Sequence, residues 1–312
     1  MVAEGKTFQK ALFFGAYYPV NDFINLATMP FLRHLPPGFQ RIHHHTIHVL
    51  KFPGLNPKGD NIVFIHGIAA FSSTWAPLIK SLLPIARSFL VFDLPGHGMS
   101  PAPEPPFTAR DAYFLARDCL VRNLDPDAPN LIIGNSLGGG FAFRFCYENP
   151  EFARRSVLIS PAGAPFPVSA RAVISRFLVK SFGDACKMIE DVWTHPTKAN
   201  YLTAPLIMNT AKQPGFISMM QSLIDIDKDP DGPVGQLLFQ PEMVKNYHIP
   251  TLFIWGQEDR ILPVEMRNYF DQYLPDTTTR FFPEDLGHCP HLENAPLIAR
   301  QIIDWRKKLL SK

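Results

Sequence analysis

Short apolar runs alternate with longer amphipathic segments over most of the chain. The runs are rich in Val, Ile, Leu and Phe without polar alternation, which is typical of strands buried on both faces of a parallel sheet. They are NIVFIHG from Asn61, SFLVFDLPG from Ser88, NLIIG from Asn130, RSVLIS from Arg155, PTLFIWG from Pro250 and TTRFFPE from Thr278. The segments between them are long enough for crossover helices. This alternation predicts an α/β fold with a doubly wound, mostly parallel sheet.

The alternation stops between the fourth and the fifth run. The stretch between them contains helical patterns instead of a strand candidate, and prolines and glycines mark both of its ends. We therefore expect a helical cap, residues 163–243, inserted into an α/β core that is formed by residues 41–162 and 244–312.

Aromatic side chains are concentrated in residues 1–40. The apolar run ALFFGAYY is too short to span a bilayer, and Pro19, Asn21 and Asp22 interrupt its continuation. No small-residue cleavage site follows it, so a signal peptide is not predicted. We expect a helical arm packed on the core. The alternative is an arm that touches a membrane surface or a partner, because amphipathic aromatic segments can lie in an interface.

Composition excludes some classes of partner. Lys+Arg 30 and Asp+Glu 28 leave a net charge of +2, which argues against binding nucleic acid. The four cysteines are widely spaced and form no CxxC pair, which indicates reduced thiols in a cytoplasmic protein, membrane-associated if the arm binds a surface. The run from His43 to His45 predicts a surface strand rather than a metal site, because adjacent strand residues point to opposite faces. We expect neither a metal nor a cofactor.

A serine stands between glycines where the third apolar run ends. The sequence is Gly134-Asn135-Ser136-Leu137-Gly138, followed by two more glycines. A tight strand-to-helix turn holds such a serine in a strained conformation, and its flanking positions leave no room for side chains. A phosphate-binding loop would need a lysine before the serine or threonine, and none is present. Ser136 is therefore the candidate nucleophile.

Two later strand ends supply the partners that a serine nucleophile needs. A serine hydroxyl requires a base, and a histidine acting as that base requires a carboxylate to orient it. Asp259 follows the fifth run and His288 follows the sixth, so both are expected with Ser136 at the carboxyl edge of the sheet. The backbone N–H groups of Leu137 and Ile68 are the expected oxyanion hole.

Five motifs together resemble the capped branch of the α/β-hydrolase fold superfamily. They are FIHGIAAFSSTW, DLPGHGMS, GNSLGGGFAF, WGQEDRILP and GHCPHLE, and they extend over most of the chain from about residue 62. The resemblance implies the chain order nucleophile, carboxylate, histidine, which Ser136, Asp259 and His288 follow. The joint spacing is highly specific for the fold and much less specific for the substrate.

Two reaction types remain open on this triad. Asn135 before the serine is similar to the meta-cleavage-product hydrolases, which split a carbon–carbon bond in a dienoate, but Cys289 stands where that family usually carries tryptophan. The apolar, Met-rich cap favours a hydrophobic ester or acyl substrate. We therefore expect a serine hydrolase of hydrophobic carboxylic esters that works through an acyl-enzyme. Carbon–carbon hydrolysis and a catalytically inactive ligand-binding protein are the alternatives. The candidate pocket residues are His66, Asn135, Phe177, Met219 and Cys289.

Overall fold

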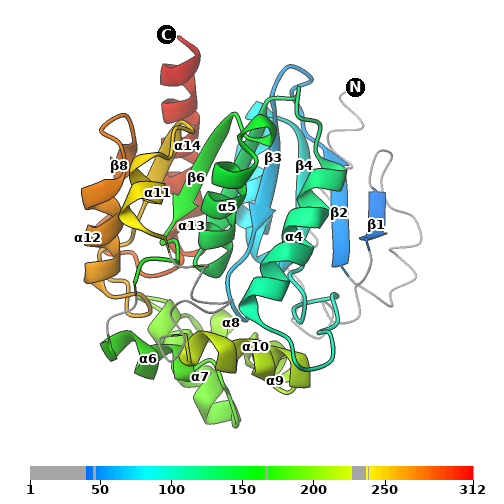
Figure 1. Ribbon diagram of the computed structural model, residues 1–312, viewed down its shortest axis with the longest axis vertical. Helices are drawn as coiled ribbons and strands as arrows, with labels where there is room; N and C mark the ends of the chain where they lie inside the picture. Colours follow the sequence, from blue (N-terminus) through cyan, green and yellow to red (C-terminus); the bar gives the residue numbers. More distant parts are fainter. Residues whose placement is uncertain (1–39, 45–46, 166–167, 227–236, 238, 312) are drawn as a thin grey trace.

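A mixed β-sheet forms the centre of the computed structural model, which describes residues 40–44, 47–165, 168–226, 237 and 239–311. Within these residues the sheet has eight strands in the order β1-β2-β4-β3-β5-β6-β7-β8 (Figure 1). β2 pairs antiparallel with β1 and β4, and all the other pairs are parallel. The strands are β1 Gln40–His44, β2 Ile47–Pro53, β3 Asp60–Ile65, β4 Ala86–Phe92, β5 Asn130–Asn135, β6 Arg155–Ile159, β7 Thr251–Ile254 and β8 Thr279–Phe281.

Each of the six apolar runs forms one strand, β3 to β8, which confirms the predicted doubly wound, mostly parallel sheet. Strand β3 shows why its run does not alternate with polar residues. Ile62 and Phe64 belong to the apolar cluster on one face of the sheet, whereas Val63 and Ile65 belong to the cluster on the other. All four side chains are fully buried, so both faces of the strand need apolar residues.

Helices cover both faces of the sheet (Figure 1). α3 and α14 pack on one face, and α4, α5 and α12 pack on the other. The helices are α3 Ala76–Leu82, α4 Ala109–Asn123, α5 Leu137–Glu148, α6 Val168–Ser175, α7 Phe182–Val192, α8 Lys198–Tyr201, α9 Ala204–Ala211, α10 Pro214–Ile224, α11 Pro241–Lys245, α12 Val264–Tyr273, α13 Pro290–Glu293 and α14 Ala295–Leu310.

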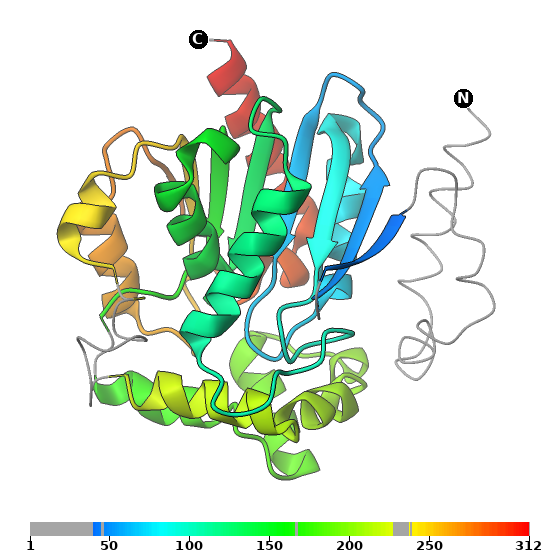
Figure 2. The same ribbon diagram turned by 45° about the vertical axis from the view of Figure 1, so that its right-hand side comes forward.

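Helices α6 to α10, which we call the inserted helices, follow β6 in the chain and gather at one end of the sheet (Figure 2). Side chains of α10 accept hydrogen bonds from backbone N–H groups just before α4 and at its first residue. Ser218 Oγ accepts from Phe107 at 3.1 Å, and Ser222 Oγ accepts from Ala109 at 3.1 Å. The inserted helices also share one apolar cluster with α4 and α5. The domain boundaries at residues 163 and 243 stay a prediction.

The first residues of β3 and β6 meet the last turns of α14 at a buried carboxylate. Asp60 at the start of β3 accepts from Arg155 Nη2 at 2.6 Å and from Arg306 Nε at 2.7 Å. Its side chain is 1% exposed, so the two guanidinium groups neutralise a charge that water cannot reach. This cluster ties β3, β6 and α14 together at the edge of the sheet opposite to Ser136.

The predicted arm of residues 1–40 lies outside the described residues except for Gln40, which begins β1. Its packing and its membrane contact therefore stay predictions. In the part of the chain that the structure describes, no helix is both long enough and apolar enough to cross a bilayer.

Candidate active site

Ser136 occupies a strained turn between β5 and α5. Its backbone angles are φ 55° and ψ −124°, a conformation that non-glycine residues rarely adopt. The flanking glycines make this turn sterically feasible. A Cβ on Gly134 would lie 2.2 Å from the carbonyl oxygen of Gly138, and a Cβ on Gly138 would lie 2.2 Å from that of Ile65. The turn thus presents the Ser136 hydroxyl beside the first turn of α5, as the sequence predicts.

A histidine and an aspartate meet close to this turn, although 29 residues separate them in the chain. His288 Nδ1 lies 2.8 Å from Asp259 Oδ2, and these side chains are 3% and 2% exposed. The other carboxylate oxygen of Asp259 accepts from the N–H groups of Ile261 and Leu262, both at 2.9 Å. Because Asp259 can only accept, Nδ1 carries the proton and Nε2 is left as the basic nitrogen. Within the described residues, Nε2 is buried without a hydrogen-bond partner.

Asn135 connects the serine turn to the histidine loop. Its Nδ2 donates to the carbonyl oxygens of His288 at 3.1 Å and of Ile159 at 3.2 Å. Its Oδ1 accepts from Cys289 Sγ at 3.5 Å. Asn135 therefore fixes the backbone on both sides of the gap between Ser136 and His288, a role that no sequence motif indicated.

The loop after β3 packs directly against the serine. A Cβ on Gly67 would lie 2.9 Å from Ser136 Cβ, so only glycine permits this approach. Ile68 and Leu137 both line the cavity beside Ser136. In the described part of the chain, neither of their N–H groups donates to a protein acceptor. These are the two N–H groups that the sequence predicts as the oxyanion hole, and that role stays a prediction.

His66 holds this loop in place through hydrogen bonds of both its ring nitrogens. Its Nδ1 donates to the Gly67 carbonyl at 2.8 Å, and its Nε2 accepts from the Leu94 N–H at 2.9 Å. Burial lowers the pKa of His66, so the ring stays neutral and can accept this hydrogen bond. The side chain is 1% exposed and does not line the cavity. The prediction of His66 as a pocket residue is therefore corrected to a structural role.

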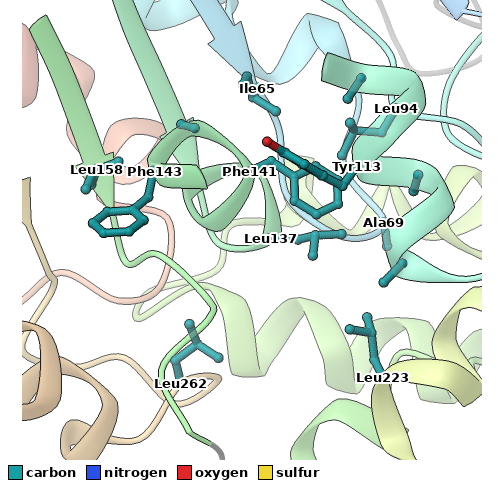
Figure 3. Close-up of a cluster of buried hydrophobic side chains, with 14 of the residues drawn as sticks. Ile65, Ala69, Leu94, Tyr113, Leu137, Phe141, Phe143, Leu158, Leu223 and Leu262 are labelled. Carbon is teal, nitrogen blue, oxygen red and sulfur yellow. The ribbon is translucent and has the colours of Figure 1, made fainter. Parts of the chain in front are cut away.

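A narrow apolar cavity opens beside Ser136. In Figure 3, Leu137 and Phe141 of α5 face this space from one side, and Leu223 and Leu262 lie across from them. Apart from Ser136 and Arg144, the described lining residues are glycine or apolar: Ile68, Leu137, Gly140, Phe141, Ala162, Gly163, Ile174, Phe177, Leu223, Ile226, Leu237, Phe239, Ile261 and Leu262.

Of the predicted pocket residues, Phe177 lines the cavity, whereas Asn135, Cys289 and Met219 do not. Asn135 is occupied by the hydrogen bonds described above. Burial, and secondarily the charge of Asp259, raise the pKa of the Cys289 thiol well above its usual value, so the thiol is not a nucleophile. Met219 of α10 is 1% exposed and packs in the apolar core cluster. Leu223, one turn later on the same helix, lines the cavity instead.

Two further buried histidines near the site are structural. His97 Nδ1 donates to the Pro95 carbonyl at 3.0 Å, and burial lowers its pKa to about 3. His291 stacks on Trp75 with ring centroids 4.3 Å apart, and burial, with a smaller effect of His288, lowers its pKa to about 3. Neither ring lines the cavity, so both act as neutral packing groups.

The site has a serine on a strained turn after a central parallel strand and a histidine–aspartate pair from two later strand ends. This combination defines a hydrolase-type α/β protein. The family model described as the alpha/beta hydrolase family matches residues 62–301, and the chain belongs to this family.

Proteins similar to this chain include enzymes of more than one specificity. The 2-hydroxymuconate semialdehyde hydrolase of Pseudomonas sp. strain CF600 is 24% identical over 249 residues, which are 79% of this chain and 87% of that one. A bacterial membrane phospholipase A has a TM-score of 0.74 at 19% identity, over 99% of this chain and 98% of that chain. The 2-hydroxy-6-oxo-6-phenylhexa-2,4-dienoate hydrolase of Rhodococcus sp. strain RHA1 has a TM-score of 0.71 at 19% identity, over 86% and 98%. At these identities, the solved structures show the shared fold alone.

Proposed function

We propose that the protein is a serine hydrolase of hydrophobic carboxylic esters with Ser136, His288 and Asp259 as its catalytic triad. The observation that carries the proposal is the buried, unpartnered Nε2 of His288, whose Nδ1 is held by Asp259 beside the strained serine. A desolvated imidazole with this tautomer is suited to take a proton from a serine hydroxyl.

The reaction has two halves. Ser136 Oγ bonds to the ester carbonyl carbon as His288 Nε2 takes its proton, and the N–H groups of Leu137 and Ile68 stabilise the oxyanion. The carbon–oxygen bond of the ester then breaks, and His288 returns the proton to the departing alcohol. In the second half a water molecule, deprotonated by His288, attacks the acyl-enzyme and releases the acid and free Ser136.

The charge distribution around the cavity favours an ester over a dienoate. A dienoate brings a carboxylate, which needs a cation when it leaves water. Arg144 lines the cavity but is already paired with Glu148, 2.7 Å away. Arg176 is paired with Asp191, 2.7 Å away; its side chain is 42% exposed and does not line the cavity. An uncharged ester needs no such partner.

A carbon–carbon hydrolase is the second candidate, because Asn135 precedes the serine and relatives include a 2-hydroxymuconate semialdehyde hydrolase. An inactive ligand-binding protein is the third. The experiment combines labelling by a fluorophosphonate with turnover of p-nitrophenyl esters and of a dienoate. We expect labelling and ester turnover in the wild type and neither in Ser136→Ala.

Ser160→Ala is the matched control for this experiment. Ser160 also follows a strand, has φ 40° and is buried, but it does not line the cavity. It should retain labelling and turnover. Dienoate cleavage without ester turnover would replace the proposal with carbon–carbon hydrolysis, and a folded wild type that is never labelled would leave only the ligand-binding protein.

A further inference from the structure

One face of α5 forms a continuous wall of the cavity. Leu137, Gly140, Phe141 and Arg144 all line it, at the spacing i, i+3, i+4 and i+7 of a single helix face. The seven residue steps from Leu137 to Arg144 correspond to a rise of about 10.5 Å along the helix axis. The cavity therefore follows α5 for two turns, beginning at Ser136.

The last α5 residue in the cavity lining, Arg144, is charged. Tyr147 and Glu148, the next positions on this face of α5, are not among the described lining residues. Arg144 Nε donates to Glu148 Oε1 at 2.7 Å, and the other oxygen of that carboxylate accepts from Tyr113. The Arg144 guanidinium also lies over the Tyr113 ring, 5.8 Å from its centroid. These contacts hold the charged end of Arg144 in position.

The two ends of this wall therefore differ in chemistry. Next to Ser136 stand the oxyanion-hole donors, and the lining beyond them is glycine or apolar as far as Arg144. The methylene stem of Arg144 can contact an apolar chain, whereas its charged group excludes one because desolvating a paired charge is costly. An apolar ligand is stabilised along the wall and opposed at its end.

We propose that this face of α5 binds the acyl chain of the substrate and that Arg144 limits the length of that chain. Esters with medium acyl chains of about eight carbons are therefore preferred. An extended alkyl chain advances roughly 1.25 Å per carbon, so about eight carbons fit the 10.5 Å between Leu137 and Arg144. This inference rests on the proposed ester hydrolysis. It adds a substrate class and a specificity-determining residue outside the triad.

The test measures kcat/KM for p-nitrophenyl esters with acyl chains of two to sixteen carbons. In the wild type we expect kcat/KM to rise by about threefold per added carbon, as buried methylenes contribute binding, and to fall beyond about eight carbons. Arg144→Met removes the charge and keeps an apolar stem of similar length, so the ratio of twelve- to eight-carbon ester turnover should rise by about tenfold.

Two variants control for other effects of the substitution. Arg144→Lys keeps a cation at the end of the wall and should retain the wild-type chain-length profile. Arg176→Met removes another ion-paired arginine, one that does not line the cavity, and it should leave the profile unchanged. Fluorophosphonate labelling of every variant reports whether Ser136 is still presented in a folded site.

The outcomes separate this inference from the proposed function. If the esters are not hydrolysed and Ser136 is not labelled, the proposed function itself fails. If esters are hydrolysed but kcat/KM is flat or still rising at sixteen carbons, α5 does not select the length of the acyl chain. The proposed serine hydrolase function is then unaffected. An optimum near eight carbons that Arg144→Met and Arg176→Met leave equally unchanged would reject Arg144 as the limit.

Discussion

Replacing Asn135 by alanine tests whether the link between the serine turn and the histidine loop serves catalysis. The substitution removes the Nδ2 donor of the His288 carbonyl oxygen, 3.1 Å away, for which the described residues offer no second donor. Ile159 keeps a partner, because its carbonyl also accepts from the Ser136 N–H at 3.0 Å. One buried acceptor is therefore left unpaired, which costs about 1–3 kcal/mol of stability.

Asn130 offers a matched control at the other end of the same strand. Its Nδ2 also donates to two carbonyl oxygens, those of Asp125 at 2.8 Å and Phe152 at 2.9 Å, and its side chain is fully buried. It lies about 16 Å from Asn135 along β5. Asn130→Ala should therefore lose a similar free energy of unfolding without disturbing the triad.

The two variants should separate in their kinetics. In Asn135→Ala the His288 backbone is no longer fixed relative to Ser136, and a misplacement of about 1 Å lowers kcat by about 100-fold. Asn130→Ala should keep kcat within about twofold of the wild type, since its bonds are remote from the reacting atoms. Urea unfolding gives the stability of each variant, and ester turnover under folding conditions gives kcat. Equal kcat losses in both variants, or none in Asn135→Ala, would refute the reasoning.

Two further predictions concern stability. Asp60→Ala leaves the Arg155 and Arg306 guanidinium groups without their shared counter-charge, so the free energy of unfolding should fall by about 3–5 kcal/mol; an unchanged urea midpoint would contradict this. The pKa of His291 is about 3 in the fold and about 6.5 when unfolded, so its neutral ring stabilises the fold fully above pH 6.5 and progressively less as the pH falls toward 3. Because His291→Phe cannot be protonated, urea unfolding at pH 4 to 6 should show a slope smaller by about 1.4 kcal/mol per pH unit than in the wild type. The same slope in both proteins would show that His291 does not titrate as described.

The sequence predicted the sheet and the catalytic candidates because each depends on neighbouring residues. A strand buried on both faces needs an uninterrupted apolar run, and six such runs became β3 to β8. The turn at Ser136 needs glycines at fixed offsets, where any Cβ would meet backbone atoms. Parallel strands end at one edge of a sheet, so Asp259 and His288 could be placed near Ser136 before any contact was known.

The roles of the remaining site residues were decided by the tertiary structure. Asn135 and Cys289 looked like pocket residues in the sequence, yet a hydrogen bond across 154 positions turns them toward each other and away from the cavity. Leu223 and Met219 lie one turn apart on α10 and have the same apolar pattern, but Leu223 faces the cavity and Met219 the core. Hydrophobic periodicity indicates that a side chain is buried. It does not indicate which surface the side chain contacts, because the hydrophobic effect is non-directional. The shape of the cavity, and with it the choice of substrate, therefore depends on how α5, α6 and α10 pack together.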